Sequence, residues 1–222
     1  MLEQPPQNNG AGVSLTSTTI QYAINVKAGS VLLIACRVGA TGRTITVSDD
    51  INGAWTAGPT IAQSTDGHQT YLYAFVGSAG GSRPTVTFAI SGVAATLRLA
   101  ILEYSHAVAA DQSNSAQSTG TAATVQATTT TPTEICIGVA THNNADGGLW
   151  TAGVGWKKLS ESGGSGSCLL VEELIASSSS TYDHNPTCGG TNGSWTSLIW
   201  TFPYNIPAPQ RSLKFVHLRK AK

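Results

Sequence analysis

The chain has 222 residues, of which 41% are hydrophobic and only 11% are charged. This length can bury a sizeable core, and β-sandwiches of about 200–250 residues commonly form one domain. Twelve Lys and Arg residues balance twelve Asp and Glu residues. The sequence therefore has no net charge that would attract nucleic acid or an anionic membrane.

The composition also bears on where the protein acts. The first residues lack the basic and apolar segments of a secretory signal peptide. No run approaches the ~18 apolar residues that a membrane-spanning helix needs. Low charge weakens the repulsion between molecules, which favours a protein packed against neighbours in an assembled or secreted particle.

The first half of the chain predicts strands, because apolar and polar residues alternate or form short apolar runs. Residues 1–12, rich in Gln, Asn, Pro and Gly, predict an extended N-terminal arm. Asn52-Gly53 predicts a turn, since both residues tolerate positive φ. The predicted strands of this half lie at 20–26, 31–36, 44–48, 69–76, 85–90 and 97–104.

The second half repeats the order of the first. Trp-Thr-Ala-Gly stands at 55–58 and again at 150–153. Residues 105–122 are predicted to form a crossing loop, and the Thr/Ala-rich residues 121–130 an edge strand. The predicted strands of the second half lie at 133–140, 168–174 and 196–202, which gives repeats at 29–104 and 132–203.

This pattern predicts an all-β fold. Helical periodicity is nearly absent, and residues 107–110 are the only short helix candidate. Many short strands separated by turns indicate a two-repeat, jelly-roll-like β-sandwich body over residues 13–204. Extended arms flank this body at both ends.

The C-terminal tail, residues 205–222, is basic and partly apolar. Its last twelve residues hold five of the twelve basic residues of the chain and no acidic one. Such an extended segment is suited to adding a strand to a neighbouring sheet, although packing on its own body, nucleic-acid binding and disorder remain alternatives. The predicted partner-binding residues are Leu213, Lys214, Phe215, Val216, Leu218 and Arg219.

Catalytic motifs are absent from the sequence. No nucleophile elbow, phosphate loop or zinc-protease motif occurs, and the five histidines are scattered, which favours solvated loop positions. Glu103 with Glu172 or Glu173 is the one carboxylate pair considered for glycoside hydrolysis, which needs about 5–10 Å between carboxyl groups in an open groove. Asp49-Asp50 with Asn52 favours a capped turn over a calcium site. We expect no catalytic residue, no metal site and no cofactor.

The cysteines and aromatic residues are interpreted mainly as core. Cys36 and Cys136 lie in apolar strands, and a disulfide between Cys168 and Cys188 is left open. Trp55 and Trp150 occupy matched positions, which indicates core residues. Trp195, placed in a loop, and Tyr182 are the candidates for exposed ligand contacts, with burial of Trp195 as the alternative.

The chain resembles a duplicated β-sandwich module found in bacteriophage structural proteins and in bacterial secreted proteins. The motifs that carry the resemblance are the strand 31–36, residues 47–49 running into 52–56, the strand 99–104 before Ala110-Asp111, and residues 150–156. The resemblance covers about residues 15–203 and brings no catalytic residues. It implies fold more than function.

These observations favour a non-enzymatic structural protein of a virus particle, such as a bacteriophage capsid decoration, tail or fibre component. Its expected location is the virion, and its expected partners are other virion chains, including copies of itself. The alternative is a carbohydrate-binding or adhesive module of a bacterial surface or secreted protein, with a host-surface glycan as ligand. Neither hypothesis involves membrane insertion or nucleic acid.

Overall fold

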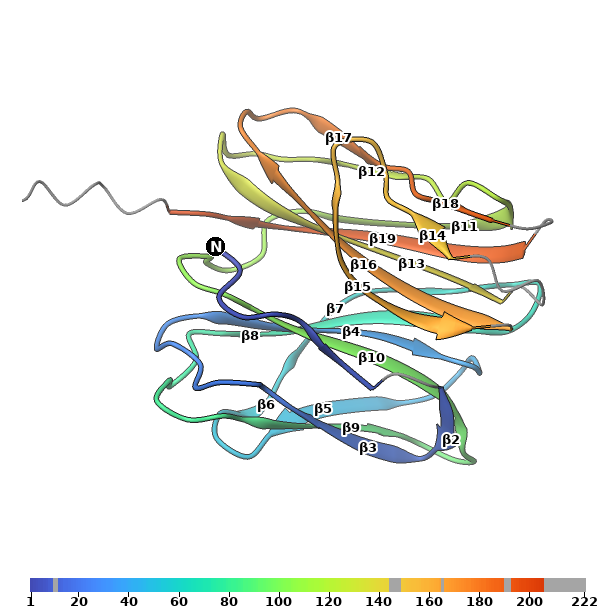
Figure 1. The fold of residues 1–222 in the computed structure, drawn as a ribbon, viewed down its shortest axis with the longest axis horizontal. Helices are drawn as coiled ribbons and strands as arrows, with labels where there is room; N and C mark the ends of the chain where they lie inside the picture. Colours follow the sequence, from blue (N-terminus) through green and yellow to red (C-terminus); the bar gives the residue numbers. More distant parts are fainter. Residues whose placement is uncertain (10–11, 144–148, 165, 190–192, 206–222) are drawn as a thin grey trace, which may run out of the picture.

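The computed structural model describes residues 1–9, 12–143, 149–164, 166–189 and 193–205 (Figure 1). These residues form antiparallel strands and connecting segments without a helix, so no helix among them could cross a membrane. The all-β prediction is confirmed. Each repeat forms its own two-sheet sandwich, and the two sandwiches stack through their larger sheets.

The first sandwich pairs a six-stranded sheet with a four-stranded one. The large sheet has the order β1-β10-β4-β8-β7, with β2 also paired to β10, and the small sheet has the order β3-β9-β5-β6. The strands are β1 (Gln7–Asn8), β2 (Val13–Leu15), β3 (Ser17–Gln21), β4 (Val31–Val38), β5 (Ile45–Asp49), β6 (Gly53–Ala54), β7 (Thr56–Ala62), β8 (Gln69–Val76), β9 (Thr85–Ile90) and β10 (Ala95–Tyr104).

The second sandwich repeats this strand order. Its large sheet runs β11-β19-β13-β16-β15, and the pairs β12-β17 and β14-β18 take the place of the small sheet. The strands are β11 (Ser113–Gly120), β12 (Val125–Thr128), β13 (Glu134–Asn143), β14 (Trp150–Thr151), β15 (Lys157–Gly164), β16 (Ser167–Ala176), β17 (Thr181–His184), β18 (Thr187–Cys188) and β19 (Gly193–Pro203).

The central strands β4 and β13 are buried on both faces. Figure 1 shows four layers, with the two large sheets in the middle. In β4, Leu33 and Ala35 face the second sandwich, whereas Leu32 and Ile34 face the interior of the first. A strand covered on both sides has no reason to alternate with polar residues, which explains the continuous apolar run at 31–36.

Two segments differ from the expectation. Residues 113–120, predicted as part of a crossing loop, form strand β11 along β19. The N-terminal arm is extended, but it lies along β10 of its own body: Gln7 pairs with Ile101, and Glu3 N donates to Glu103 O at 3.0 Å. The C-terminal tail from residue 206 on lies outside the described residues.

The repeated Trp-Thr-Ala-Gly motif has a packing role in each copy. Trp55 is 6% exposed and Trp150 is 2% exposed, as predicted for core residues. A Cβ atom added to Gly58 would lie 2.4 Å from the Trp200 ring, and one added to Gly153 would lie 2.9 Å from Asn185 Oδ1. Gly58 therefore permits close packing of the first sandwich against the second, and Gly153 permits close packing within the second sandwich.

Candidate functional site

The interface between the two sandwiches is apolar in its middle and polar at both ends. Its middle consists of residues such as Leu33, Leu72, Ile137 and Leu198, all buried. At one end, buried Tyr104 donates its hydroxyl to Glu173 Oε2 at 2.9 Å, and Glu173 Oε1 accepts from Lys157 Nζ at 2.9 Å. Burial and the nearby Glu173 carboxylate raise the pKa of Tyr104 well above its ordinary value.

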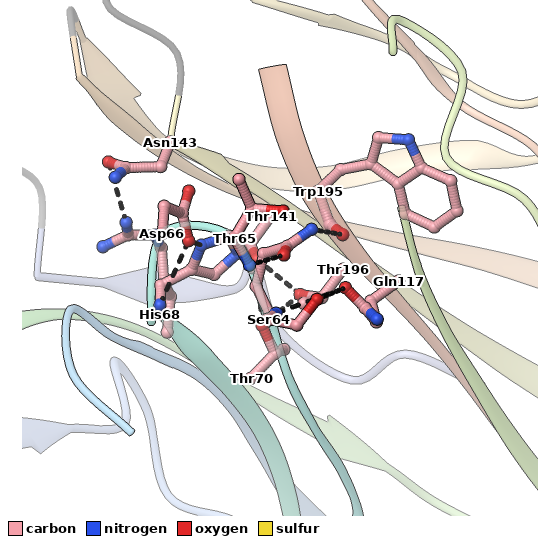
Figure 2. Close-up of polar contacts among 12 residues, drawn as sticks. Ser64, Thr65, Asp66, His68, Thr70, Gln117, Thr141, Asn143, Trp195 and Thr196 are labelled. Carbon is pink, nitrogen blue, oxygen red and sulfur yellow. Dashed lines mark hydrogen bonds and ion pairs between the residues drawn. The ribbon is translucent and has the colours of Figure 1, made fainter. Parts of the chain in front are cut away.

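The opposite end carries three buried threonines, which we call the threonine cluster (Figure 2). Thr70 Oγ1 lies 2.9 Å from Thr141 Oγ1 and 2.6 Å from Thr196 Oγ1, and the last two atoms are 2.7 Å apart. Thr70 belongs to β8, whereas Thr141 and Thr196 belong to β13 and β19. Each hydroxyl lies within hydrogen-bond distance of the other two, at the place where the two large sheets meet.

The turn between β7 and β8 also bridges the sandwiches (Figure 2). Gln63 Nε2 donates to Ser118 O at 2.7 Å and to Trp195 O at 3.1 Å. Ser64 donates from its backbone nitrogen and its hydroxyl to Gln117 Oε1, at 3.3 and 3.2 Å. These bonds fix the turn of the first sandwich against strands β11 and β19 of the second.

Beside this turn, charged side chains surround a cavity of about 140 Å³, which we call the polar cavity. Arg37 of β4 is 2% exposed and donates Nη2–H to Asn143 Oδ1 at 3.2 Å. His68, 1% exposed, has its Nδ1 at 2.6 Å from Asp66 Oδ1. The cavity is lined by Arg37, Gly39, Asp66, His68, Thr96, Asn143, Gly166 and Ser167.

Burial dominates the electrostatics of the polar cavity. It lowers the pKa of Arg37 to about 10, although the charge of Asp66 opposes the shift. It also lowers the pKa of His68, against the hydrogen bond to Asp66. Burial raises the pKa of Asp66, but the hydrogen bonds and charge of His68 outweigh it, so the carboxyl pKa lies below its ordinary value. The polar cavity therefore holds the buried Arg37 guanidinium, which donates to the neutral Asn143 side chain, beside the hydrogen-bonded His68–Asp66 pair.

A second polar group lies inside the second sandwich. His184 Nδ1 is 2.9 Å from Ser197 Oγ, and His184 Nε2 is 3.0 Å from Glu172 Oε2. Burial lowers the pKa of His184, opposed by Glu172, so the ring is neutral: Ser197 donates to Nδ1, and Nε2–H donates to the carboxylate. Serine, histidine and carboxylate also follow one another in serine hydrolase triads, but there the serine bonds to Nε2 and the acid to Nδ1–H, so the two ring nitrogens are exchanged here.

The Ser197–His184–Glu172 group is closed to substrates. All three residues have 0% exposed surface. A Cβ atom on Gly138 would lie 2.3 Å from His184 Cδ2, and Trp156 packs edge-on at 4.7 Å between ring centroids. A nucleophile needs room for a reacting carbonyl and for an oxyanion hole. The three side chains therefore serve as a satisfied core network in this structure.

A third feature is an open hollow between β11 and β12, which we call the polar groove. It consists of two adjoining depressions of about 450 and 360 Å³ that share Asn114 and Gln126. Asn114 Nδ2 donates to Gln126 O at 2.9 Å across it. Exposed Asp183 and partly buried Asn185 complete one end. Its lining offers amide, hydroxyl and carboxylate groups but, within the described part of the chain, no aromatic ring.

The two candidate aromatic contacts do not behave alike. Trp195 lies in β19 and not in a loop, and it is 5% exposed, so its expected exposure is wrong and burial is the correct alternative. It packs with Trp150, Cys168 and Cys188 in one apolar cluster. Tyr182 of β17 is partly buried, and its hydroxyl donates to Ser178 O at 3.0 Å. The six predicted partner-binding residues, Leu213 to Arg219, lie outside the described residues.

The carboxylates considered for glycoside hydrolysis do not lie in an open groove. Glu103 is 0% exposed and accepts from Gln4 Nε2, Lys27 N and Ser30 Oγ, at 2.5, 2.7 and 2.9 Å. Glu172 and Glu173 are 0% and 8% exposed, and they point to opposite faces of β16. Each is held by structural hydrogen bonds, and the sugar-cleaving arrangement is not supported.

The prediction of solvated loop positions is wrong for three of the five histidines. His68, His142 and His184 are at most 1% exposed. A buried histidine needs a partner close in space, and Glu172 and Ser197 are too far along the sequence for spacing to identify them. The only available signal is local: Asp66 stands two residues before His68.

The remaining predictions concern cysteines and the acidic turn. All four cysteines are free and buried, so Cys168 and Cys188 do not form a disulfide. Asp49 accepts from Ile51 N, Asn52 N and Trp55 Nε1, at 2.8, 2.6 and 2.7 Å, which is the capped turn expected. Among the described residues, no group of three or more His, Cys, Asp or Glu side chains could hold a metal ion.

Comparison of the chain with models of known protein families, with curated proteins and with solved structures gave no match. The function must therefore be argued from the geometry of the chain itself.

Proposed function

We propose that the chain is a non-enzymatic structural protein of a virus particle, such as a bacteriophage capsid decoration, tail or fibre component. The observation that carries this proposal is the use of reactive side chains as internal supports. Ser197, His184 and Glu172 are fully buried, and Glu103 is held by three donors. A fold that uses these groups as internal supports is suited to making contacts with other molecules rather than to catalysing a reaction.

The sheet edges provide the means of assembly. Within the described residues, each large sheet ends in edge strands: β7 on one side of the first, and β11 and β15 on the two sides of the second. An edge strand has unpaired backbone groups that can pair with a strand of another molecule. The C-terminal tail, with apolar residues on both faces, is the segment of this chain proposed to supply such a strand.

Truncation tests this proposal. Deletion of residues 211–222 is expected to leave the melting temperature of the body unchanged and to abolish assembly, seen by light scattering and negative-stain microscopy with the native particle. A matched pair separates apolar from basic contributions: Phe215→Ser with Leu218→Ser should abolish assembly, whereas Lys220→Ser with Lys222→Ser should weaken it less. Unchanged assembly of the truncated chain would overturn this role.

A carbohydrate-binding or adhesive module is the second candidate, and the polar groove favours it. Sugar hydroxyls are recognised by amide and carboxylate side chains such as those of Asn114 and Asp183. A glycan array with intact protein tests it. Specific binding that is lost in Asp183→Ala with Gln126→Ala, both exposed positions, and kept in the control Thr46→Ser, at an exposed position of the first sandwich, would place this function above the first.

A further inference from the structure

The polar groove runs between two strand edges that have no partner strand among the described residues. β11 pairs with β19 alone, and β12 pairs with β17 alone. Thr201 N donates to Gln112 O at 2.9 Å, and bonded pairs alternate with unbonded ones along an antiparallel ladder. Ser113 and every second residue after it in β11 therefore direct their backbone N–H and C=O groups away from β19.

The edge of β12 faces the same groove in the same way. Ala123 N donates to Pro186 O at 3.0 Å, which fixes the alternation of bonded pairs between β12 and β17. Thr124, Gln126 and Thr128 therefore direct their backbone groups away from β17, and all three line the polar groove. Backbone groups of two strand edges thus border one open hollow.

Asn114 connects the two edges with its side chain. Its Oδ1 accepts from Ser115 N at 2.8 Å, and its Nδ2 donates to Gln126 O at 2.9 Å. A side-chain amide has the donor and the acceptor of a peptide group. At this point an amide therefore takes the place that a peptide group of an added strand would have, which indicates the kind of group that these edges bind.

The charged and apolar groups around the groove indicate what an added strand should carry. Asp183 is the one ionisable side chain that lines the groove within the described part of the chain, and Asp111 directly precedes Gln112 at one end. At the other end Val154 is 87% exposed, and its N–H donates to Asn185 Oδ1 at 3.1 Å. The surface therefore fits an extended segment with basic and apolar side chains.

The C-terminal tail of this chain has such a composition. Residues 211–222 carry five Lys or Arg residues and no acidic one, together with the large apolar residues Leu213, Phe215, Val216 and Leu218. At about 3.3 Å per residue, twelve extended residues reach about 40 Å, whereas the eight residues of β11 reach about 26 Å. The tail is thus long enough to pair along the whole edge.

We propose that the polar groove of one molecule binds residues 211–222 of a second copy, which pair as a strand with the free edge of β11. This role rests on the proposed function of the tail as an added strand, and it names the surface that receives the tail. The Asn114 side chain turns away from Ser115 N, which then donates to the tail, and basic side chains of the tail lie toward Asp183. When each molecule gives its tail and receives one, the exchange closes a symmetric dimer.

Cysteine crosslinking between two different full-length variants tests this proposal. Ser113→Cys is mixed, under mild oxidation, with Lys214→Cys, Val216→Cys or Leu218→Cys in turn, and mass spectrometry identifies the disulfide. The four native cysteines are buried, so they do not compete. We expect a mixed dimer with at least one tail variant, and none when the control Thr46→Cys, exposed on the first sandwich, replaces Ser113→Cys.

Two substitutions change the edge itself, and sedimentation velocity over a concentration series measures their effect on self-association of the full chain. Ser115→Pro removes the N–H that the tail needs but no bond of the ladder with β19, so it should weaken association about tenfold or more. Asn114→Ala removes the amide that competes for Ser115 N and should tighten association about twofold to fivefold. If Ser115→Pro does not fold, Asn114→Ala and the charge variants decide.

A pair of charge variants tests the match between the groove and the basic tail. Asp111→Asn with Asp183→Asn should weaken association about threefold to tenfold and make it less sensitive to salt. The exposed control Asp50→Asn, on the first sandwich, should leave association unchanged.

Three outcomes would overturn the groove as the acceptor of the tail: a chain that stays monomeric over the whole series, association that all groove variants leave unchanged, or a disulfide that forms only when both cysteines are in the same chain. Groove variants without effect, combined with loss of assembly on deletion of residues 211–222, would leave the proposed role of the tail standing. Mixed dimers that bind no particle would support the groove and contradict the virus-particle proposal.

Discussion

The two sandwiches share one strand order but have different interiors. The inner face of β4 carries Leu32, Ile34, Cys36 and Val38, and the first interior is mostly one continuous apolar cluster, with the buried Glu103 carboxylate held beside it by hydrogen bonds. The inner face of β13 carries smaller residues, among them Gly138, and the space is filled by tryptophans and by the Glu172–His184 pair. The same β-sheet scaffold can thus be filled by apolar side chains or by a satisfied polar network.

The largest expected effect comes from breaking the polar interior. His184→Leu leaves the Glu172 carboxylate buried beside Gly153 N alone, and removal of one partner of a buried pair costs about 3–5 kcal/mol. Chemical denaturation measures the free energy of unfolding. The double variant His184→Leu with Glu172→Leu should recover most of the loss. If the single variant is as stable as the wild type, the pair does not support the second interior.

Gly138 tests the space that the histidine occupies. Gly138→Ala places a Cβ atom 2.3 Å from His184 Cδ2, and overpacking of this kind costs about 1–3 kcal/mol. The same substitution in a His184→Ala background should cost much less, because the clashing ring is gone. Equal losses in both backgrounds, in a double-mutant cycle of unfolding free energies, would contradict this packing.

The loss of stability at low pH is the next property expected to differ between the two interiors. Burial lowers the pKa of His184 and of His68 below the ordinary 6.5, so the unfolded chain takes up protons first as the pH falls. Stability is therefore complete above about pH 6.5 and declines below it, by up to about 1.4 kcal/mol per pH unit for each histidine. In the double variant His184→Leu with Glu172→Leu, the free energy of unfolding should decline less steeply between neutral and mildly acidic pH, as measured by chemical denaturation at a series of pH values. An equally steep decline in both proteins would exclude His184 as a source of the acid sensitivity.

The smallest expected effect concerns chemical labelling of Ser197 by a serine-reactive probe. Because its hydroxyl is fully buried, a fluorophosphonate probe should not label the folded chain, and mass spectrometry should give the same result for wild type and Ser197→Ala. Labelling of the wild type that disappears in Ser197→Ala would reveal an opening of the second sandwich and would favour a hydrolase.

The sequence predicts the framework better than the interiors. Apolar runs at 31–36 and 135–140, and the repeated Trp-Thr-Ala-Gly, suffice for an all-β duplication. Strand β11 escapes prediction because its Ser, Asn, Gln and Thr side chains are mostly exposed and leave no apolar period. Asn192-Gly193 signals a turn, which hides the start of β19 and the burial of Trp195.

The candidate sites are the part that the sequence predicts least well, for a physical reason. The polar cavity joins Arg37, His68, Asn143 and Ser167, which come from four separate strands or turns of two repeats. No local pattern records that their side chains converge. Besides the Asp66–His68 spacing, Arg37 could have drawn attention, since it directly follows a run of apolar residues within one strand.

The doubly covered central strands have a consequence for the stability of a single repeat. Leu33, Ala35 and Leu72 of one repeat are hidden only because the other repeat covers them. A single repeat on its own would expose this sheet face to water, so it could be stable only with a second copy against it. Two repeats in one chain make that contact independent of protein concentration.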